Sequence, residues 1–275
     1  MIESKLDYIS KINEIFKNKF NSCADGKVIT DAEKLKNQAF NIFDEVNVEM
    51  VEEIKKIFDY KRDYHIEYDV LIGPITRSGV REGIIDAIGD VQVFLFGVNH
   101  FVGLSKEKYT ESKFLSSDSV VADFTDLKTQ IKNKNTMIER LNLVVFEIDK
   151  RTTTLIAEIY DGNTIDKLSD AIQSVDTACQ IGYELMGTNG DLVIKSIAES
   201  NYSKVCPNED NLARSLKHYR DLGIEVHSIE VEFGDSSKKY AVISSINQTG
   251  NDGKYYNKDK FLKSVDFLEP ITTIW

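Results

Sequence analysis

The sequence predicts a mainly α-helical protein: a helical bundle that is internally duplicated and carries a small β-hairpin near its C-terminus. Two observations predict the bundle. Two acidic segments have apolar residues at helical spacing, and a later pair of segments resembles them. Alternating and β-branched residues after position 222 predict the hairpin. The chain has 275 residues, of which 41% are hydrophobic, and is long enough to bury such a core.

The first predicted helix lies in the segment NQAFNIFDEVNVEMVEEIKKIFD. Its apolar residues recur every three or four positions and form one stripe, which consists of Ala39, Phe43, Val46, Met50, Ile54 and Ile57. Four acidic residues accompany this stripe: Glu45, Glu49, Glu52 and Glu53. Glu49 and Glu53 lie at the edge of the stripe, so we do not expect them to be ordinary solvated glutamates.

The second predicted helix lies in REGIIDAIGDVQVFLFGVNHFVG, and its apolar stripe consists of Ala87, Val91, Phe94, Val98 and Phe101. Glu82, Asp86 and Asp90 follow one another at four-residue spacing along its border. Charges of the same sign at that spacing repel by a few tenths of a kcal/mol per pair, and the helix has no lysine to offset them. We interpret the two acidic rows as a site for a divalent cation between the helices. Two solvated acidic faces are the alternative.

An internal duplication is predicted from two alignments. DAIGDVQVFLFGVNHFVG at 86–103 aligns without gaps with DAIQSVDTACQIGYELMG at 170–187, an offset of 84 residues, with five of eighteen positions identical. The preceding helices end in the similar sequences IFDY at 57–60 and IYDG at 159–162. In the second copy Ser174 replaces Asp90, and threonines and Arg151 occupy the acidic row, so we expect this copy to have lost the cation site. Chance similarity between two amphipathic helices is the alternative.

Four regions are predicted along the chain: a metal-binding helical unit at 1–104, a linker with one or two short helices at 105–127, a degenerate second helical unit at 128–200, and a tail at 201–275. The tail contains the predicted hairpin, formed by GIEVHSIEVE at 223–232 and by YAVISSI, which is rich in strand-forming residues. HIEYDVLIG at 65–73 is a further predicted strand.

The two acidic helices resemble those of the all-α nucleoside triphosphate pyrophosphohydrolases, the superfamily of MazG-like enzymes, dimeric dUTPases and phosphoribosyl-ATP pyrophosphohydrolases. Its signature is two adjacent glutamates with a third three positions on, followed after a connector by a glutamate and an aspartate three apart. Glu49 with Glu52 reproduces the inner spacing of the glutamate motif and Glu49 with Glu53 its outer spacing, while Asp86 matches the aspartate. The expected second-helix glutamate is Gly83 here, with Glu82 beside it. The resemblance implies a MazG-like helical bundle.

This resemblance implies a metal-dependent hydrolase that converts a nucleoside or deoxynucleoside triphosphate to the monophosphate and pyrophosphate. Mg²⁺, with Mn²⁺ as a substitute, is the implied cofactor. Glu49, Glu53 and Asp86 are the expected ligands of the principal metal. Further acids are expected to hold a second metal or to orient the attacking water, and these are Glu52, Glu82 and Asp90. The expected catalytic residues are Glu49, Glu52, Glu53 and Asp86.

A second stretch extends the resemblance to the substrate. AESNYSK at 198–204, followed after an insertion by DGKYYNKDKFLKSVDFLEP, resembles the Ser-Asn-x-Ser-Lys and Asp-Gly-Lys elements of the phosphoribosyl-ATP pyrophosphohydrolase-like branch. Asn201, Lys204 and Lys254 are therefore expected to contact the nucleotide, with Lys204 neutralising phosphate. Arg77 and Arg81, just before the second acidic helix, form a second candidate phosphate-binding loop. A plain helix cap is the alternative for that loop.

Charge and composition exclude other classes of protein. A net charge of −11 and a pI near 5.0 argue against a nucleic-acid-coating protein, which needs a basic surface. Cys23, Cys179 and Cys206 are too few and too scattered for a disulfide framework or a zinc site. The N-terminus lacks the apolar core of a secretory signal, and no apolar run reaches the roughly 18 residues of a membrane span. We therefore expect a cytoplasmic protein without a nucleic-acid or membrane partner.

Two alternatives to the enzyme come from other classes. One is a non-catalytic nucleotide-binding or regulatory helical module, which binds nucleotide and metal without turnover. The other is a structural helical protein whose acidic rows bind a basic partner. For the oligomeric state, the resemblance to the pyrophosphohydrolases implies active sites built where helix pairs of two protomers pack together. The second copy is then expected to supply the partner surface within the chain, which implies a monomeric pseudo-dimer or a homodimer.

Overall fold

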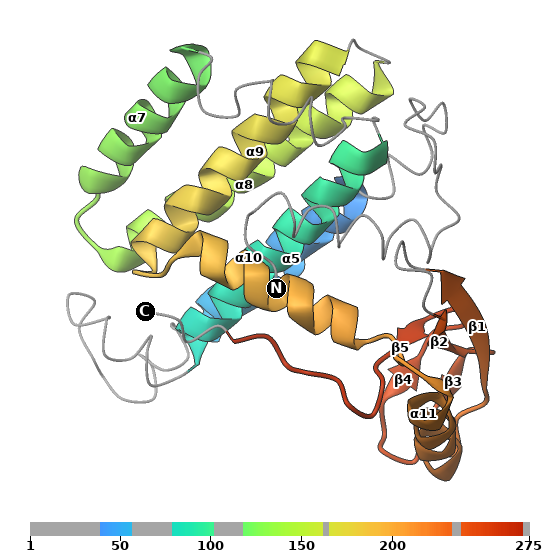
Figure 1. Cartoon of the computed structure of the whole chain (residues 1–275). Helices are drawn as coiled ribbons and strands as arrows, with labels where there is room; N and C mark the ends of the chain where they lie inside the picture. The colour runs from blue at the N-terminus through green and yellow to red at the C-terminus, as the bar shows by residue number, and fades with distance from the viewer. Residues whose placement is uncertain (1–38, 57–78, 102–117, 162–164, 233–237, 272–275) are drawn as a thin grey trace. The chain divides into compact units, whose positions relative to one another are not determined.

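The computed structural model describes residues 39–56, 79–101, 118–161, 165–232 and 238–271 (Figure 1). These residues are mainly helical, as predicted, with a small group of antiparallel strands near the C-terminus. They divide into two compact units. We call the first, which reaches Lys195, the helical unit, and the second, Ser196–Pro270, the C-terminal unit.

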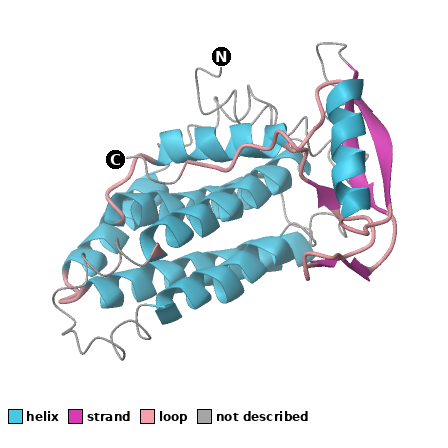
Figure 2. Cartoon of the chain, turned by 90° about the horizontal axis from the view of Figure 1, so that it is seen from below, coloured by secondary structure: helices cyan, strands magenta, loops and turns pink. Residues whose placement is uncertain are grey.

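Four long helices of the helical unit pack in a ring. The helix of residues 39–56, whose middle is the π-helix η1 (Glu45–Met50), packs against α5 (Val80–Phe101). Next to α5 lies α9 (Ile165–Leu185), which packs against α8 (Met137–Tyr160), and α8 completes the ring by contacting η1. In Figure 2 these helices run alongside one another. A further helix, α7 (Asp118–Lys132), packs against α8 and α9, and α10 (Gly190–Ser203) begins in this unit.

The core of the ring contains most of the predicted apolar stripes. On the 39–56 helix Val46 and Met50 are fully buried as predicted, but Phe43 is 36% exposed and Ile42 is buried instead. Positions 42 and 43 both fit helical spacing from Ala39, so only packing against the other helices could select between them. On α5 Phe94 is half-buried rather than buried. No helix in the described ranges is long and apolar enough to cross a membrane.

The start of α8 is defined by a capping box. Thr136 accepts a hydrogen bond from the backbone N–H of Glu139 at 3.3 Å, and Glu139 accepts one from the N–H of Thr136 at 3.0 Å. The hydrogen bond from the Thr136 backbone lowers the pKa of Glu139 below its ordinary value. The preceding helix, α7, begins at Asp118, inside the predicted linker, and continues beyond position 127 to Lys132.

Three helices approach closely at Gly182 of α9. A Cβ atom there would lie 2.7 Å from Cδ1 of Ile88 on α5 and 3.3 Å from Cγ1 of Val144 on α8. Distances this short leave no room for even a methyl group without a shift of the neighbouring side chains. The glycine therefore determines how closely α5, α8 and α9 can pack.

The predicted hairpin is confirmed in the C-terminal unit. The strands β1 (Val226–Glu232) and β2 (Lys238–Ser244) are antiparallel, and β5 (Phe261–Leu262) pairs with the other edge of β2. A second pair, β3 (Gln248–Thr249) and β4 (Tyr255–Tyr256), is also antiparallel. Helix α11 (Glu209–Asp221) packs on β1 and β2. The predicted strand at 65–73 lies outside the described residues.

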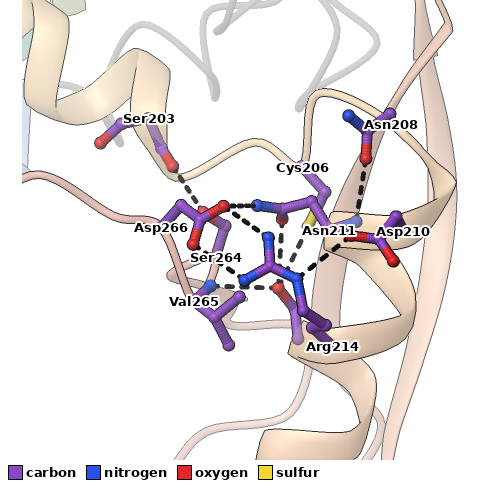
Figure 3. Close-up of polar contacts among 10 residues, drawn as sticks. Ser203, Cys206, Asn208, Asp210, Asn211, Arg214, Ser264, Val265 and Asp266 are labelled. Atoms are coloured by element: carbon purple, nitrogen blue, oxygen red, sulfur yellow. Dashed lines mark hydrogen bonds and ion pairs between the residues drawn. The ribbon is translucent and has the colours of Figure 1, made fainter.

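Hydrogen bonds and an ion pair connect the last described segment of this unit to α11 (Figure 3). Asp266 accepts hydrogen bonds from Arg214 at 2.7 Å and from Asn211 at 2.6 Å. Ser215 accepts one from the backbone N–H of Val265 at 3.0 Å. The hydrogen bonds from Arg214 hold the pKa of Asp266 below its ordinary value, so this contact strengthens once the carboxyl is ionised.

Candidate functional site

Three carboxylates from two helices form an acidic cluster in the helical unit. Glu45 and Glu49 come from η1 and Asp90 comes from α5, and one oxygen from each lies within 4.8 Å of the others. Glu45 and Asp90 are half-buried, whereas Glu49 is exposed. We call these three residues the acidic cluster. Two of them, Glu49 and Asp90, are among the predicted metal ligands, and the structure brings them together.

The local helix geometry distinguishes this cluster from an ordinary acidic face. Glu45 and Glu49 are four residues apart within a single π-helical segment, which ends at Met50. Short π-helical segments are rare and occur frequently at functional sites. The π-helical segment therefore coincides with the two carboxylates that this helix contributes.

The electrostatics of the cluster centre on Glu45. Burial, followed by the negative charges of Asp90 and Glu49, raises the pKa of Glu45 to about 8. A hydrogen bond between the Glu45 and Glu49 carboxyls and the charge of Asp86 act in the same direction. A carboxyl with this pKa keeps its proton near neutral pH unless a cation replaces it.

Two further carboxylates of the predicted set have an unsatisfied oxygen. Oε2 of Glu53 and Oε2 of Glu82 are buried and have no hydrogen-bond partner among the described residues, and the same is true of Oε2 of Glu45. A buried carboxylate oxygen without a donor is costly, so these three oxygens are the positions at which a bound ligand would gain most from contact with the described residues. The other oxygen of Glu53 is paired with Lys56.

The glycine at position 83 has a direct structural consequence. A Cβ atom on Gly83 would lie 2.4 Å from the carboxyl carbon of Glu53. The Glu53 carboxyl therefore occupies space that a larger residue on α5 would fill. Where the resemblance leads one to expect a glutamate on α5, the structure has a carboxylate from the 39–56 helix.

The remaining predicted metal ligands differ in burial and in their distance from the acidic cluster. Asp86 is half-buried and close enough to Glu45 to raise its pKa, whereas Glu52 is exposed and is not among the three clustered residues. The sequence argument missed Glu45 as a ligand, although it lies four residues before Glu49. A spacing of four residues puts both carboxylates on one helix face, and this spacing could have identified Glu45 as a candidate ligand.

A buried hydrogen-bond network lies on the other side of α5. Gln92 donates to Asp176 at 2.6 Å and accepts from the Tyr183 hydroxyl at 2.8 Å. Gln92 is fully buried, and burial together with nearby negative charges, including those of Asp90 and Asp86, raises the pKa of Tyr183 well above its ordinary value. Tyr183 therefore remains a neutral hydrogen-bond donor that holds α5 against α9.

Arg81, a predicted phosphate ligand, has structural partners. Its side chain is buried, and its Nε donates to the backbone carbonyl of Met186 at 2.9 Å, just beyond the end of α9. Arginine commonly caps a helix C-terminus in this way. Arg77 lies outside the described residues.

The other three predicted nucleotide contacts belong to the C-terminal unit. Lys204 donates to Asn201 at 2.5 Å near the end of α10. Lys254 is exposed, and its backbone N–H bonds to Asp252 at 3.1 Å in the turn between β3 and β4. Asn201 and Lys204 are thus adjacent in space as well as in sequence, as a shared role in binding requires.

Comparison with known proteins identifies one distant relative. The uncharacterized protein L479 of Acanthamoeba polyphaga mimivirus is 25% identical over 217 residues, which cover 74% of this chain and 79% of the relative. No family model and no solved structure matches the chain. The chain is therefore similar to a viral protein of undescribed role.

Proposed function

We propose that the protein is a metal-dependent nucleoside triphosphate pyrophosphohydrolase. The observation that carries this proposal is the acidic cluster, in which three carboxylates from two helices converge at a π-helical segment. The resemblance of the two helices to those of the all-α pyrophosphohydrolases supports it, and on that resemblance we infer a bundle of the MazG-like type.

The residues fit a hard divalent cation. Carboxylate oxygens are the ligands preferred by Mg²⁺ and Mn²⁺. Two oxygens bound to one Mg²⁺ are at most about 4.2 Å apart, so a small rotation of side chains already within 4.8 Å suffices. The unsatisfied buried oxygen of Glu45 is a further reason to expect a cation there. We therefore assign Glu45, Glu49 and Asp90 as ligands of the principal metal, in place of the predicted set of Glu49, Glu53 and Asp86.

The reaction adds water across the anhydride bond between the α- and β-phosphates, releasing the monophosphate, pyrophosphate and a proton. When bound, the metal neutralises the triphosphate and polarises the phosphoryl group that is attacked. Glu53 and Glu82 each keep a buried oxygen without a donor among the described residues. Such an oxygen can accept a hydrogen bond from the attacking water and take its proton. The negative charge of Asp86, which is close enough to Glu45 to raise its pKa, favours a cation held by Glu45 and Asp90.

A pyrophosphate-release assay tests the proposal. The purified protein is incubated with each of the eight common NTPs and dNTPs in Mg²⁺, in Mn²⁺ and in EDTA. We expect release from one or a few nucleotides that depends on metal. Asp90→Asn and Glu49→Gln should each reduce that release by more than roughly 100-fold, since each removes a metal ligand.

The matched control is Asp170→Asn, which makes the same change at an exposed position of α9. Full activity of Asp90→Asn and Glu49→Gln would overturn the site. Absence of release from all eight nucleotides, with metal binding intact, would favour the non-catalytic nucleotide-binding module instead. If neither variant alters metal affinity, the acidic rows serve a structural role.

A further inference from the structure

Two residues that the sequence alignment makes equivalent touch each other. Gln92 of α5 and Asp176 of α9 are separated by 84 positions, the offset that relates the two copies, and they share the 2.6 Å hydrogen bond described above. Gln92 meets Asp176 and Ile88 meets Gly182, so α5 and α9 run antiparallel. In an antiparallel pair of repeats, a residue contacts its own equivalent where a two-fold axis passes close to both. The interface between α5 and α9 is therefore the place for such an axis.

A second pair shows the same relation in the preceding helices. The alignment of IFDY at 57–60 with IYDG at 159–162 corresponds to an offset of 102 residues. Asn47 of η1 and Asp149 of α8 are 102 positions apart, and the Asn47 amide donates to Asp149 at 2.8 Å. The two contacts lie at the two interfaces between the copies in the ring of helices, α5 with α9 and η1 with α8.

Burial repeats at the same two offsets. Four buried positions of the 39–56 helix, Ala39, Ile42, Val46 and Met50, have buried equivalents in Leu141, Val144, Ile148 and Thr152. Six buried positions of α5, Ile84, Ala87, Ile88, Val91, Gln92 and Leu95, have buried equivalents in Leu168, Ala171, Ile172, Val175, Asp176 and Cys179. Chance similarity of two amphipathic helices does not explain why contacts and burial agree on one pair of offsets.

The same offsets connect the acidic cluster to three residues of the second copy. Glu45 corresponds to Glu147 and Glu49 to Arg151 at an offset of 102, and Asp90 corresponds to Ser174 at an offset of 84. These three residues are also in contact.

The contacts of the second-copy cluster centre on its arginine. The Arg151 guanidinium lies 3.3 Å from a Glu147 carboxylate oxygen, and it donates to the Ser174 hydroxyl at 2.7 Å. Arg151 and Glu147 are both buried. A positive group thus lies among the equivalents of three converging carboxylates.

We propose that the helical unit is an internal duplication about a pseudo-two-fold axis, and that its second copy retains a cation site closed by the Arg151 guanidinium. The guanidinium supplies, inside the chain, the positive charge that we assign to a divalent cation at the acidic cluster. The inference rests on the proposed function only in taking the acidic cluster as a cation site.

The test restores the lost carboxylates and counts bound ions. Mn²⁺ binding is measured by electron paramagnetic resonance for the full chain and for Arg151→Glu/Ser174→Asp. We expect one Mn²⁺ per chain in the natural protein and two in the variant, with a rise in unfolding temperature on adding Mn²⁺ that is larger for the variant. The matched control, Thr153→Asp/Lys167→Glu, makes the same charge change at exposed positions of α8 and α9 and should bind one.

Three outcomes separate the two proposals. One ion in the natural protein and one in the folded Arg151→Glu/Ser174→Asp variant overturns the closed site while leaving the proposed function intact. No ion in the natural protein and one in the variant supports the closed site and overturns the metal requirement of the proposed function. An extra ion in the control variant as well overturns the closed site, because the added charge alone then binds Mn²⁺.

If Arg151→Glu/Ser174→Asp does not fold, the reverse substitution in the first copy tests the proposed closed site instead. Glu49→Arg places an arginine at the exposed first-copy position equivalent to Arg151. We expect it to abolish Mn²⁺ binding and to raise the unfolding temperature in EDTA, because the guanidinium then offsets the charges of Glu45 and Asp90. A lower unfolding temperature than that of the natural protein in EDTA would overturn the proposal.

Discussion

The acidic cluster and its counterpart around Arg151 occupy equivalent places in the ring of helices. They differ in how the negative charge of their carboxylates is neutralised. In the first, the carboxylates of Glu45, Glu49 and Asp90 converge, and the pKa of Glu45 rises to about 8. In the second, Arg151 lies between Glu147 and Ser174. The comparison teaches that two replacements, arginine for Glu49 and serine for Asp90, separate a cluster that we propose to bind an external cation from one that is neutralised internally.

Removing the guanidinium should have the largest effect. Arg151→Gln removes the buried partner of Glu147 and leaves it, among the described residues, with only the exposed Lys150, 3.4 Å away. We therefore expect a cost of about 3 kcal/mol, the lower end of the range for breaking a buried ion pair. We expect chemical denaturation to show a loss of this size. Glu49→Gln, the equivalent change in the acidic cluster, should not destabilise the metal-free protein, because it removes repulsion. Equal losses for the two variants would contradict the comparison.

The pH dependence of stability tests the acidic cluster next. Because folding raises the pKa of Glu45 from 4.5 to about 8, the folded state binds the proton more tightly than the unfolded state. Its contribution to stability is complete below about pH 4.5 and is lost as the pH rises through about 8. Denaturation curves in EDTA should therefore show the natural protein losing stability relative to Glu45→Gln across this window. Added Mn²⁺ should reduce the loss, and parallel curves in EDTA would show that Glu45 is not perturbed.

The interface between the two copies is tested at Gly182. Gly182→Ala places a methyl group 2.7 Å from Cδ1 of Ile88, and overpacking of this kind costs about 1–3 kcal/mol. Ile88→Val/Gly182→Ala removes the Ile88 methyl and should recover part of the loss. A Gly182→Ala protein with unchanged stability would mean that α5 and α9 are not packed this closely.

The smallest expected effect is at the start of α8. Thr136→Ala removes the side-chain cap, at a cost of about 1 kcal/mol. Thr136→Ser retains the hydroxyl and should retain most of the stability. Because this cap lies outside the second-copy cluster, neither substitution should change the number of Mn²⁺ ions bound by Arg151→Glu/Ser174→Asp, and a change would show that α8 as a whole must move to admit the ion.

Much of the helical unit could be predicted because its signals are local. Helical periodicity identified the two acidic helices and put Val46, Met50 and Val91 in the core, where they are found. Alternation and β-branching likewise predicted the strands that became β1 and β2. The candidate ligands Glu49 and Asp90 were identified because they border apolar stripes, and the structure brings their carboxylates together.

What failed depended on neighbours that periodicity does not specify. Ile42 rather than Phe43 faces the core, although both positions fit the spacing. Glu45 joins Glu49 and Asp90, whereas Glu53 lies over Gly83 farther along the same pair of helices. Which acids meet depends on where two antiparallel helices cross and on the π-helical segment within one of them, and neither is encoded in residue spacing.

The sequence by itself determined the helical class, the C-terminal hairpin, the acidic borders and the replacement of Asp90 by Ser174, because each follows from residue type and spacing along the chain. Only the tertiary structure decided that Arg81 caps α9 and that Arg151 reaches Glu147 and Ser174. A long side chain such as arginine can reach many partners. Which of them it meets depends on the packing of helices that are far apart in sequence.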